Sequence, residues 1–244
     1  MLMQEPTESG SLVVEVGADP SVLIVVFSGA KGVWGSRRNF DFAQATDRLN
    51  YSRILCRDPY HIWYHEGLDE KRHDIVSFAD CIREHIEALN PKAMMFIGNS
   101  VGGYAAILFG HLLGADSVHA FAPQTCLQPD YVKQHRRLDS PEKLEAYDRL
   151  WSSQHAQWQW FDLNAVLSEY NGRTTYFVHH CADSGPDRHA AEWIAGREGV
   201  RVHNYPCDGH SVARHIAKNK LLLKILRPDL KEVLAALSDE RNIQ

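Results

Sequence analysis

The sequence predicts an α/β fold: a doubly wound, mostly parallel sheet of about seven strands with flanking helices and a small helical insertion. Short apolar runs rich in β-branched residues, such as residues 22–27, are typical of strands buried on both faces. Segments with helical periodicity alternate with these runs, as the crossover connections of parallel strands require. The length of 244 residues suits one domain covering residues 1–244.

The individual elements are predicted from apolar runs bounded by turn residues and from spacings near 3.6 residues. The expected strands cover residues 11–16, 22–27, 53–57, 94–97, 117–121, 174–180 and 200–205. The expected helices cover residues 71–89, the stretch after 100, residues 186–195, and 212–237 with an interruption at Pro228; residues 39–49 are expected to be partly helical. Residues 124–165 are polar, contain no strand-like run and end in aromatic residues, so they are expected to form a cap-like helical insertion.

Composition and charge exclude several classes of function. The net charge is −5 and no basic block is present, which argues against nucleic acid as a partner. No apolar run approaches the roughly 20 residues that a membrane helix needs. The first ten residues lack the apolar stretch of a signal peptide, so none is expected.

The cysteines are odd in number, scattered, and contain no C-x-x-C pair. This pattern predicts free thiols in a reducing cytoplasm rather than a disulfide framework. Cys56 and Cys207 lie within or near predicted strands and are expected to be core residues.

The stretch Gly98-Asn99-Ser100-Val101-Gly102 lies between a predicted strand and a predicted helix. Strand, G-x-S-x-G and helix in this order are typical of a nucleophile elbow, which holds a serine hydroxyl at the end of a strand. The helix that follows directs its first amides, including that of Val101, toward the place where an oxyanion would form. A P-loop would need Lys and Ser or Thr after its second glycine, and a dinucleotide-binding loop would need G-x-G-x-x-G; neither pattern is present.

Two further polar residues follow later predicted strands. Asp183 comes after the strand at 174–180, and His210 comes after the strand at 200–205. With Ser100, Asp183 and His210 in this chain order, the sequence resembles the α/β-hydrolases over nearly its whole length. Two other acids have ordinary explanations: Asp187 suits a helix start, and Asp208 suits a turn.

The resemblance implies roles for these residues. Ser100 would be the nucleophile, His210 the general base and acid, and Asp183 the group that orients the imidazole. The oxyanion hole would combine the amide of Val101 with one from the loop after residues 22–27. Ala30 is the matching position there, with Gly29 and Lys31 as alternatives.

Aromatic residues after strand ends are candidates for substrate binding. Tyr60, Trp63 and Tyr64 follow the third predicted strand, and Trp160 belongs to the aromatic cluster of the insertion. Ordinary packing explains such residues equally well, because aromatic side chains serve cores and sites alike. Lys31 and the pair Arg136-Arg137 are candidates for contact with an anionic substrate, although exposed basic residues are usually just solvated.

No metal or cofactor is expected. His61 and His65 are four residues apart but follow Pro59 in a predicted loop, without the glutamate of an H-E-x-x-H frame. We therefore expect a serine hydrolase that acts on a carboxylic ester or thioester of a small molecule or acyl conjugate. An acyltransferase, a peptidase, a lactonase and a non-catalytic binding or accessory protein remain alternatives, and the sequence does not indicate an oligomeric state.

Overall fold

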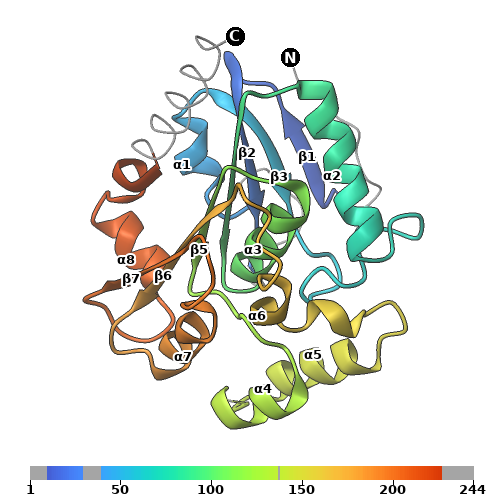
Figure 1. The fold of residues 1–244 in the computed structure, drawn as a ribbon, viewed down its shortest axis with the longest axis vertical. Helices are drawn as coiled ribbons and strands as arrows, with labels where there is room; N and C mark the ends of the chain where they lie inside the picture. The colour runs from blue at the N-terminus through green and yellow to red at the C-terminus, as the bar shows by residue number, and fades with distance from the viewer. Residues whose placement is uncertain (1–9, 30–39, 137, 227–244) are drawn as a thin grey trace.

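A seven-stranded sheet forms the centre of the computed structural model, which describes residues 10–29, 40–136 and 138–226 (Figure 1). Its strand order is β1-β3-β2-β4-β5-β6-β7, and only the β1–β3 pair is antiparallel. The strands are β1 (Leu12–Glu15), β2 (Asp19–Phe27), β3 (Tyr51–Cys56), β4 (Ala93–Asn99), β5 (Ser117–Phe121), β6 (Thr175–Cys181) and β7 (Val200–Tyr205). The predicted mostly parallel sheet of about seven strands is confirmed.

Helices cover both faces of this sheet (Figure 1). They are α1 (Ala43–Asp47), α2 (Ile75–Leu89), α3 (Val101–Leu113), α4 (Pro129–His135), α5 (Pro141–Ser152), the 3-10 helix η2 (Trp158–Trp160), α6 (Leu163–Val166), α7 (Gly185–Ile194) and α8 (Val212–Lys218). Side chains of α2, α3 and α7 belong to the core on one face, and side chains of α1 and α8 belong to the core on the other. None of the helices within the described ranges is long and apolar enough to span a membrane.

The central strands explain why the sequence shows continuous apolar runs. In β4, Met94 and Phe96 pack into one core, whereas Met95 and Ile97 pack into the other. Successive side chains of a strand point to opposite faces, so a strand covered on both sides needs apolar residues at every position.

Two helix boundaries differ from the prediction. α2 begins at Ile75 rather than near residue 71, because Asp74 caps it: the Asp74 carboxylate accepts from the Ser77 amide, and the Ser77 hydroxyl accepts from the Asp74 amide. The C-terminal helix expected over residues 212–237 ends its first part at Lys218, and residues 227–244 lie outside the described residues.

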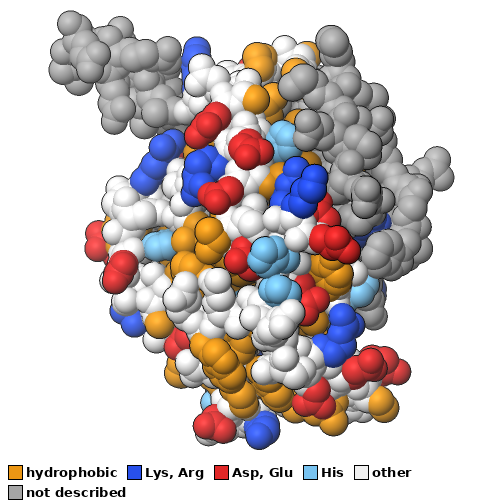
Figure 2. Space-filling view, turned by 90° about the vertical axis from the view of Figure 1, so that its right-hand side faces the viewer, with side chains coloured by type: hydrophobic (Ala, Val, Ile, Leu, Met, Phe, Trp, Pro, Cys, Tyr) orange, Lys and Arg blue, Asp and Glu red, His pale blue; other side chains and the backbone are white. Residues whose placement is uncertain are grey.

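The helical segment 124–165 follows β5 and lies at the carboxyl ends of the parallel strands (Figure 1). Its two ends are held together, because the Leu127 amide donates to the Phe161 carbonyl and the Leu163 amide donates to the Thr125 carbonyl. Figure 2 shows hydrophobic side chains gathered at this lower end of the molecule, where Leu144 and Trp158 are exposed. The segment is therefore placed above the strand ends, where a site would lie.

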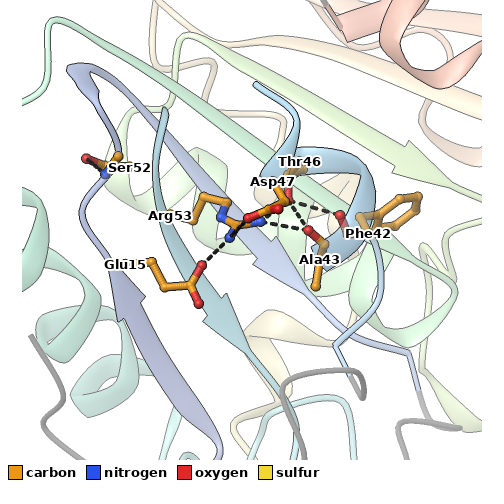
Figure 3. Close-up of polar contacts among 8 residues, drawn as sticks. Glu15, Phe42, Ala43, Thr46, Asp47, Ser52 and Arg53 are labelled. Carbon is orange, nitrogen blue, oxygen red and sulfur yellow. Dashed lines mark hydrogen bonds and ion pairs between the residues drawn. The ribbon is translucent and has the colours of Figure 1, made fainter. Parts of the chain in front are cut away.

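The buried guanidinium of Arg53 fixes α1 to the sheet (Figure 3). The Arg53 guanidinium in β3 binds the carboxylates of Glu15 in β1 and Asp47 in α1, and it also donates to the carbonyl of Ala43 and the hydroxyl of Thr46. The side chains of Arg53 and Glu15 are only 9% and 10% exposed. A buried charge is costly without an opposite charge, so this contact matters for both side chains.

We expect Arg53→Met to lower the free energy of unfolding by about 3–5 kcal/mol, because it removes a buried cation that pairs with the Glu15 carboxylate. Urea denaturation followed by circular dichroism measures this loss. Arg83→Met is the matched control: Arg83 pairs with Asp80 on exposed α2 surface, and its loss should cost less than about 1 kcal/mol. Equal losses in the free energy of unfolding would show that the buried pair contributes no more to stability than the exposed one.

Candidate active site

Ser100 lies at the sharp turn between β4 and α3. Its backbone has φ 56° and ψ −115°, a conformation that costs a non-glycine residue about 1–3 kcal/mol and persists only where the surroundings enforce it. The Ser100 amide donates to the Phe121 carbonyl at 2.8 Å, and the Ser100 carbonyl accepts from the Tyr104 amide at 3.1 Å. These bonds hold the turn between β5 and the first turn of α3. The predicted strand, turn and helix around Ser100 are present.

The glycines beside Ser100 allow backbones to approach more closely than side chains permit. A Cβ atom on Gly98 would lie 1.9 Å from the Gly102 carbonyl oxygen, and one on Gly102 would lie 2.1 Å from the Phe27 carbonyl oxygen. No residue other than glycine fits at either position without moving backbone. The two glycines of the motif are therefore required by the close contact of the start of α3 with the ends of β2 and β4.

The His210 imidazole is bound by a buried carboxylate, but that carboxylate belongs to Asp187. His210 Nδ1 lies 2.8 Å from Asp187 Oδ1 and 3.0 Å from Oδ2. Because a carboxylate only accepts hydrogen bonds, Nδ1 carries the proton and Nε2 keeps its lone pair. The Asp187 side chain is 2% exposed and that of His210 is 41% exposed. The acid is thus shielded, while the imidazole faces solvent.

This pairing corrects the expectation that Asp183 orients His210. β6 extends to Cys181, and the exposed Asp183 falls in the turn that follows. Ser184 then caps α7, its hydroxyl accepting from the Asp187 amide. Asp187 looked like an ordinary capping acid in the sequence, yet Ser184 already fills that role. The buried side chain of Asp187 is therefore available for His210, and the exposed Asp208 also forms no hydrogen bond with it.

The loop after β2 meets the elbow where the second oxyanion donor was expected. The Gly29 amide donates to Asp41 Oδ2 at 2.9 Å, so it is already engaged; this corrects its assignment as a possible oxyanion donor. The Asp41 amide in turn donates to the Ser28 hydroxyl at 3.1 Å. Burial raises the pKa of Asp41, and the bond from Gly29 opposes that rise. Sequence reasoning missed Asp41, which precedes α1 and shows no motif.

The other residues expected to form the oxyanion hole stay predictions. Val101 is the first residue of α3, so its amide is among those without a partner inside the helix. Ala30 and Lys31 lie outside the described residues.

The aromatic loop after β3 is mainly a packing element, which corrects the expectation that Trp63 and Tyr64 bind substrate. Tyr64 is fully buried and Trp63 is 4% exposed. The Tyr64 hydroxyl donates to the Ser28 carbonyl at 2.9 Å, beneath the β2 loop. Asp58, also buried, accepts from the amides of Tyr60 and Tyr64 and folds the loop around itself. Tyr60 is only partly buried.

A buried histidine and tyrosine connect this loop to the segment 124–165. The Tyr104 hydroxyl donates to the Trp160 carbonyl at 2.6 Å, so it accepts from His65 Nε2 at 3.0 Å. Burial lowers the pKa of His65 to about 3, which keeps the ring neutral. Trp160 itself is partly buried, and its indole donates to Gln157. These contacts fix the backbone at Trp160 against α3.

Within the described residues, no group of three or more His, Cys, Asp or Glu side chains is arranged to hold a metal. A pocket of about 320 Å³ does open beside the elbow, between the stretch 40–45 and α8. Asn99, next to Ser100, lines it together with Asp41. Its other lining residues are mostly apolar: Phe40, Phe42, Ala43, Gln44, Ala45, Ala213, Ala217 and Leu222.

A disulfide joins Cys181 at the end of β6 to Cys207 in the loop before His210. The expectation of free thiols is therefore wrong for these two residues, and Cys207 is only partly buried rather than a core residue. Cys56, Cys81 and Cys126 are free and buried. Register explains the pairing: Cys181 lies opposite Tyr205 across β6 and β7, so Cys207 follows two residues later. The argument for a reducing compartment loses its basis, because disulfides persist in oxidising ones.

Reduction of this disulfide should lower the free energy of unfolding by about 3–4 kcal/mol. The bond links residues 26 positions apart, and without it the unfolded chain gains conformational entropy. Urea denaturation with and without dithiothreitol measures the difference. The double variant Cys181→Ala/Cys207→Ala is the control and should not respond to reductant. Free thiols at both positions in a non-reducing peptide map would contradict the pairing.

Comparison with known proteins rests on structure alone. No protein-family model matches the sequence, and no curated protein matches it. Esterase B from Lactobacillus rhamnosis is similar in structure, with a TM-score of 0.65 and 14% identity, over 98% of this chain and 85% of that one. The capsule O-acetyltransferase of Neisseria meningitidis serogroup A has a TM-score of 0.60 and 16% identity, over 86% and 90% of the two chains.

A third similar structure is MGS-MChE2, an α/β hydrolase enzyme from a sediment metagenome of the Mar Chica lagoon, with a TM-score of 0.58 and 15% identity over 93% of this chain and 98% of that one. The parallel sheet, the elbow after β4 and the acid and histidine after β6 and β7 agree with this likeness. The chain has the α/β-hydrolase fold.

Proposed function

We propose that the protein is a serine hydrolase that cleaves a carboxylic ester or thioester through an acyl-enzyme on Ser100. The observation that carries this proposal is the hydrogen bond from His210 Nδ1 to the buried Asp187. It leaves the lone pair on Nε2, the nitrogen that must accept the serine proton. The strained elbow at Ser100 supports the same reading.

In the proposed reaction, Ser100 Oγ attacks the substrate carbonyl while its proton passes to His210 Nε2. The carbonyl oxygen takes the negative charge of the tetrahedral intermediate, which the Val101 amide stabilises. The bond to the leaving group then breaks, and His210 returns the proton to the departing oxygen or sulfur. A water molecule attacks the acyl-enzyme with His210 as base, which releases the acid and restores Ser100. Asp187 stabilises the imidazolium throughout.

Acyl transfer is the second candidate. It uses the same steps, with a hydroxyl group of an acceptor in place of water. The exposed imidazole of His210 would admit such an acceptor, and the similar capsule enzyme is named as an O-acetyltransferase. The apolar pocket beside Asn99 has a size that suits a short acyl group in either reaction.

We expect a fluorophosphonate probe to label the wild-type protein at Ser100, because its phosphorus reacts with an activated serine as a carbonyl would. In-gel fluorescence and peptide mapping identify the labelled residue. Ser100→Ala should abolish labelling while the circular dichroism spectrum stays the same. A folded wild-type protein that remains unlabelled would favour a non-catalytic binding protein on this fold.

The acid is tested by comparing Asp187→Asn with Asp183→Asn. We expect Asp187→Asn to lower kcat by about 10⁴-fold, because an amide no longer holds the imidazole in the reactive tautomer. Asp183→Asn should leave kcat close to that of the wild type, since Asp183 is exposed and does not contact His210. Hydrolysis of p-nitrophenyl acetate measures both variants. If Asp183→Asn lowers kcat more than Asp187→Asn does, Asp183 is the residue that orients His210.

A further inference from the structure

Three hydrogen-bond donors converge in the segment 124–165 without an acceptor. The buried atoms are Nη1 of Arg136 and the hydroxyl oxygens of Tyr131 and Tyr147, and none of them has a partner at full hydrogen-bond geometry within the described chain. The Thr125 side chain lies close to the Tyr131 hydroxyl, and the Arg136 guanidinium lies close to the Tyr147 hydroxyl. Both tyrosines are more than nine-tenths buried. Buried polar groups are normally paired, and each unpaired one needs a water, an ion or a ligand to explain it.

The Arg136 guanidinium acts electrostatically on both tyrosines. Burial raises the pKa of Tyr131 to about 12 and also raises that of Tyr147, and the Arg136 guanidinium counteracts both rises. The guanidinium is therefore near both hydroxyls. No described carboxylate forms an ion pair with Arg136, although Asp80, Asp116 and other acids pair with arginines elsewhere. A half-buried cation with buried phenol O–H donors near it, and no described carboxylate paired with it, is suited to bind an anion.

The cluster lies at the same end of the sheet as Ser100. On one side, the Tyr147 ring packs on Trp63 with ring centres 4.5 Å apart, and the Trp63 indole donates to Gln124. Gln124 follows Pro123, which packs against Gly103 in the first turn of α3.

On the other side, the Tyr131 ring packs on Trp193 with ring centres 4.9 Å apart. Trp193 belongs to α7, the helix that carries Asp187. The cluster is thus held between the neighbours of the elbow and the helix of the acid. Figure 1 shows α4 and α5, which carry these tyrosines, at the carboxyl ends of the strands.

We propose that Arg136, Tyr131 and Tyr147 form a subsite that binds an oxyanion of the substrate, a carboxylate or a phosphate located away from the scissile carbonyl. The proposal rests on the function proposed above and specifies its substrate class as anionic esters or thioesters. The guanidinium supplies charge and a fork of N–H donors, and each phenol supplies one O–H donor. The oxyanion supplies the acceptors that these donors lack.

The oxyanion has two possible sources, the acyl group or the leaving group, and matched substrates separate them. p-Nitrophenyl hydrogen succinate carries a carboxylate on its acyl group, and p-nitrophenyl butyrate is its neutral counterpart. Acetyl-CoA carries phosphates on its leaving group, and S-acetyl-N-acetylcysteamine is its neutral counterpart. We expect Arg136→Gln to raise KM roughly ten- to a hundredfold for one anionic substrate, in line with the loss of a charge-assisted hydrogen bond. KM for the neutral counterparts should stay unchanged.

Arg149→Gln is the matched control, because Arg149 is exposed on the neighbouring helix α5. It should leave KM unchanged for all four substrates. Equal KM changes for anionic and neutral substrates in Arg136→Gln, or no change for any of them, would overturn the subsite.

Tyr147→Phe tests the same subsite without removing charge. Deleting a hydroxyl that has no partner should leave the melting temperature of the free protein unchanged or higher. The same variant should raise KM for the anionic substrate that depends on Arg136. A lower melting temperature with unchanged KM would assign the hydroxyl to the stability of the fold and contradict the subsite.

Binding without turnover separates this proposal from the catalytic one. Titration of the Ser100→Ala variant with inorganic phosphate and with succinate should raise its melting temperature, and the further change Arg136→Gln should abolish that rise. If the wild-type protein hydrolyses none of the substrates but the Arg136-dependent rise remains, the function proposal fails and the anion site stands. If substrates are turned over and neither anion binds through Arg136, only the subsite fails.

Discussion

The backbone contact between the first turn of α3 and the ends of β2 and β4 is the constraint on which the rest of this structure depends. Gly98 and Gly102 leave no room for a Cβ atom, so the helix begins almost against the sheet. That closeness forces Ser100 into its positive φ, and a bond to the β5 carbonyl holds it there. The packing that completes the core therefore also sets the backbone conformation of Ser100.

Around this point, the surrounding loops are fixed by buried polar groups rather than by apolar packing alone. Asp41 holds the β2 loop through Gly29, and Asp58 shapes the aromatic loop that supports Ser28 from below. Arg53 ties α1, which follows Asp41, to β1 and β3. A polar group is costly to bury, so it stabilises a loop only when its hydrogen-bond partners are present. Together Asp41, Asp58 and Arg53 hold Gly29, the aromatic loop and α1 against the sheet.

Local patterns in the sequence were sufficient for the sheet and for the strand, turn and helix around Ser100, because each depends on neighbours within a few residues. The acid at Asp187 was missed, since its role depends on how α7 leaves the sheet, and an acid near a helix start has a simpler explanation. The disulfide depends on the register of β6 and β7, which spacing alone does not reveal. The loop with Trp63 and Tyr64 was misread because aromatic residues are equally typical of cores and pockets. The structure shows both side chains buried with their polar atoms already paired, to Gln124 and to the Ser28 carbonyl.

The strand order allows the sheet to form progressively while the chain is being synthesised. From β4 to β7, each new strand joins the outer edge of the sheet in the order of synthesis. A chain leaving the ribosome can therefore fold the elbow with Ser100 well before Asp187 and His210 emerge. In the proposed mechanism Ser100 depends on His210 as its base, so a chain that lacks the last strands would form no acyl-enzyme. Only after β6 and β7 have been made can Asp187 bind His210. The Cys181–Cys207 disulfide then links the end of β6 to the loop after β7, the edge strand of the sheet.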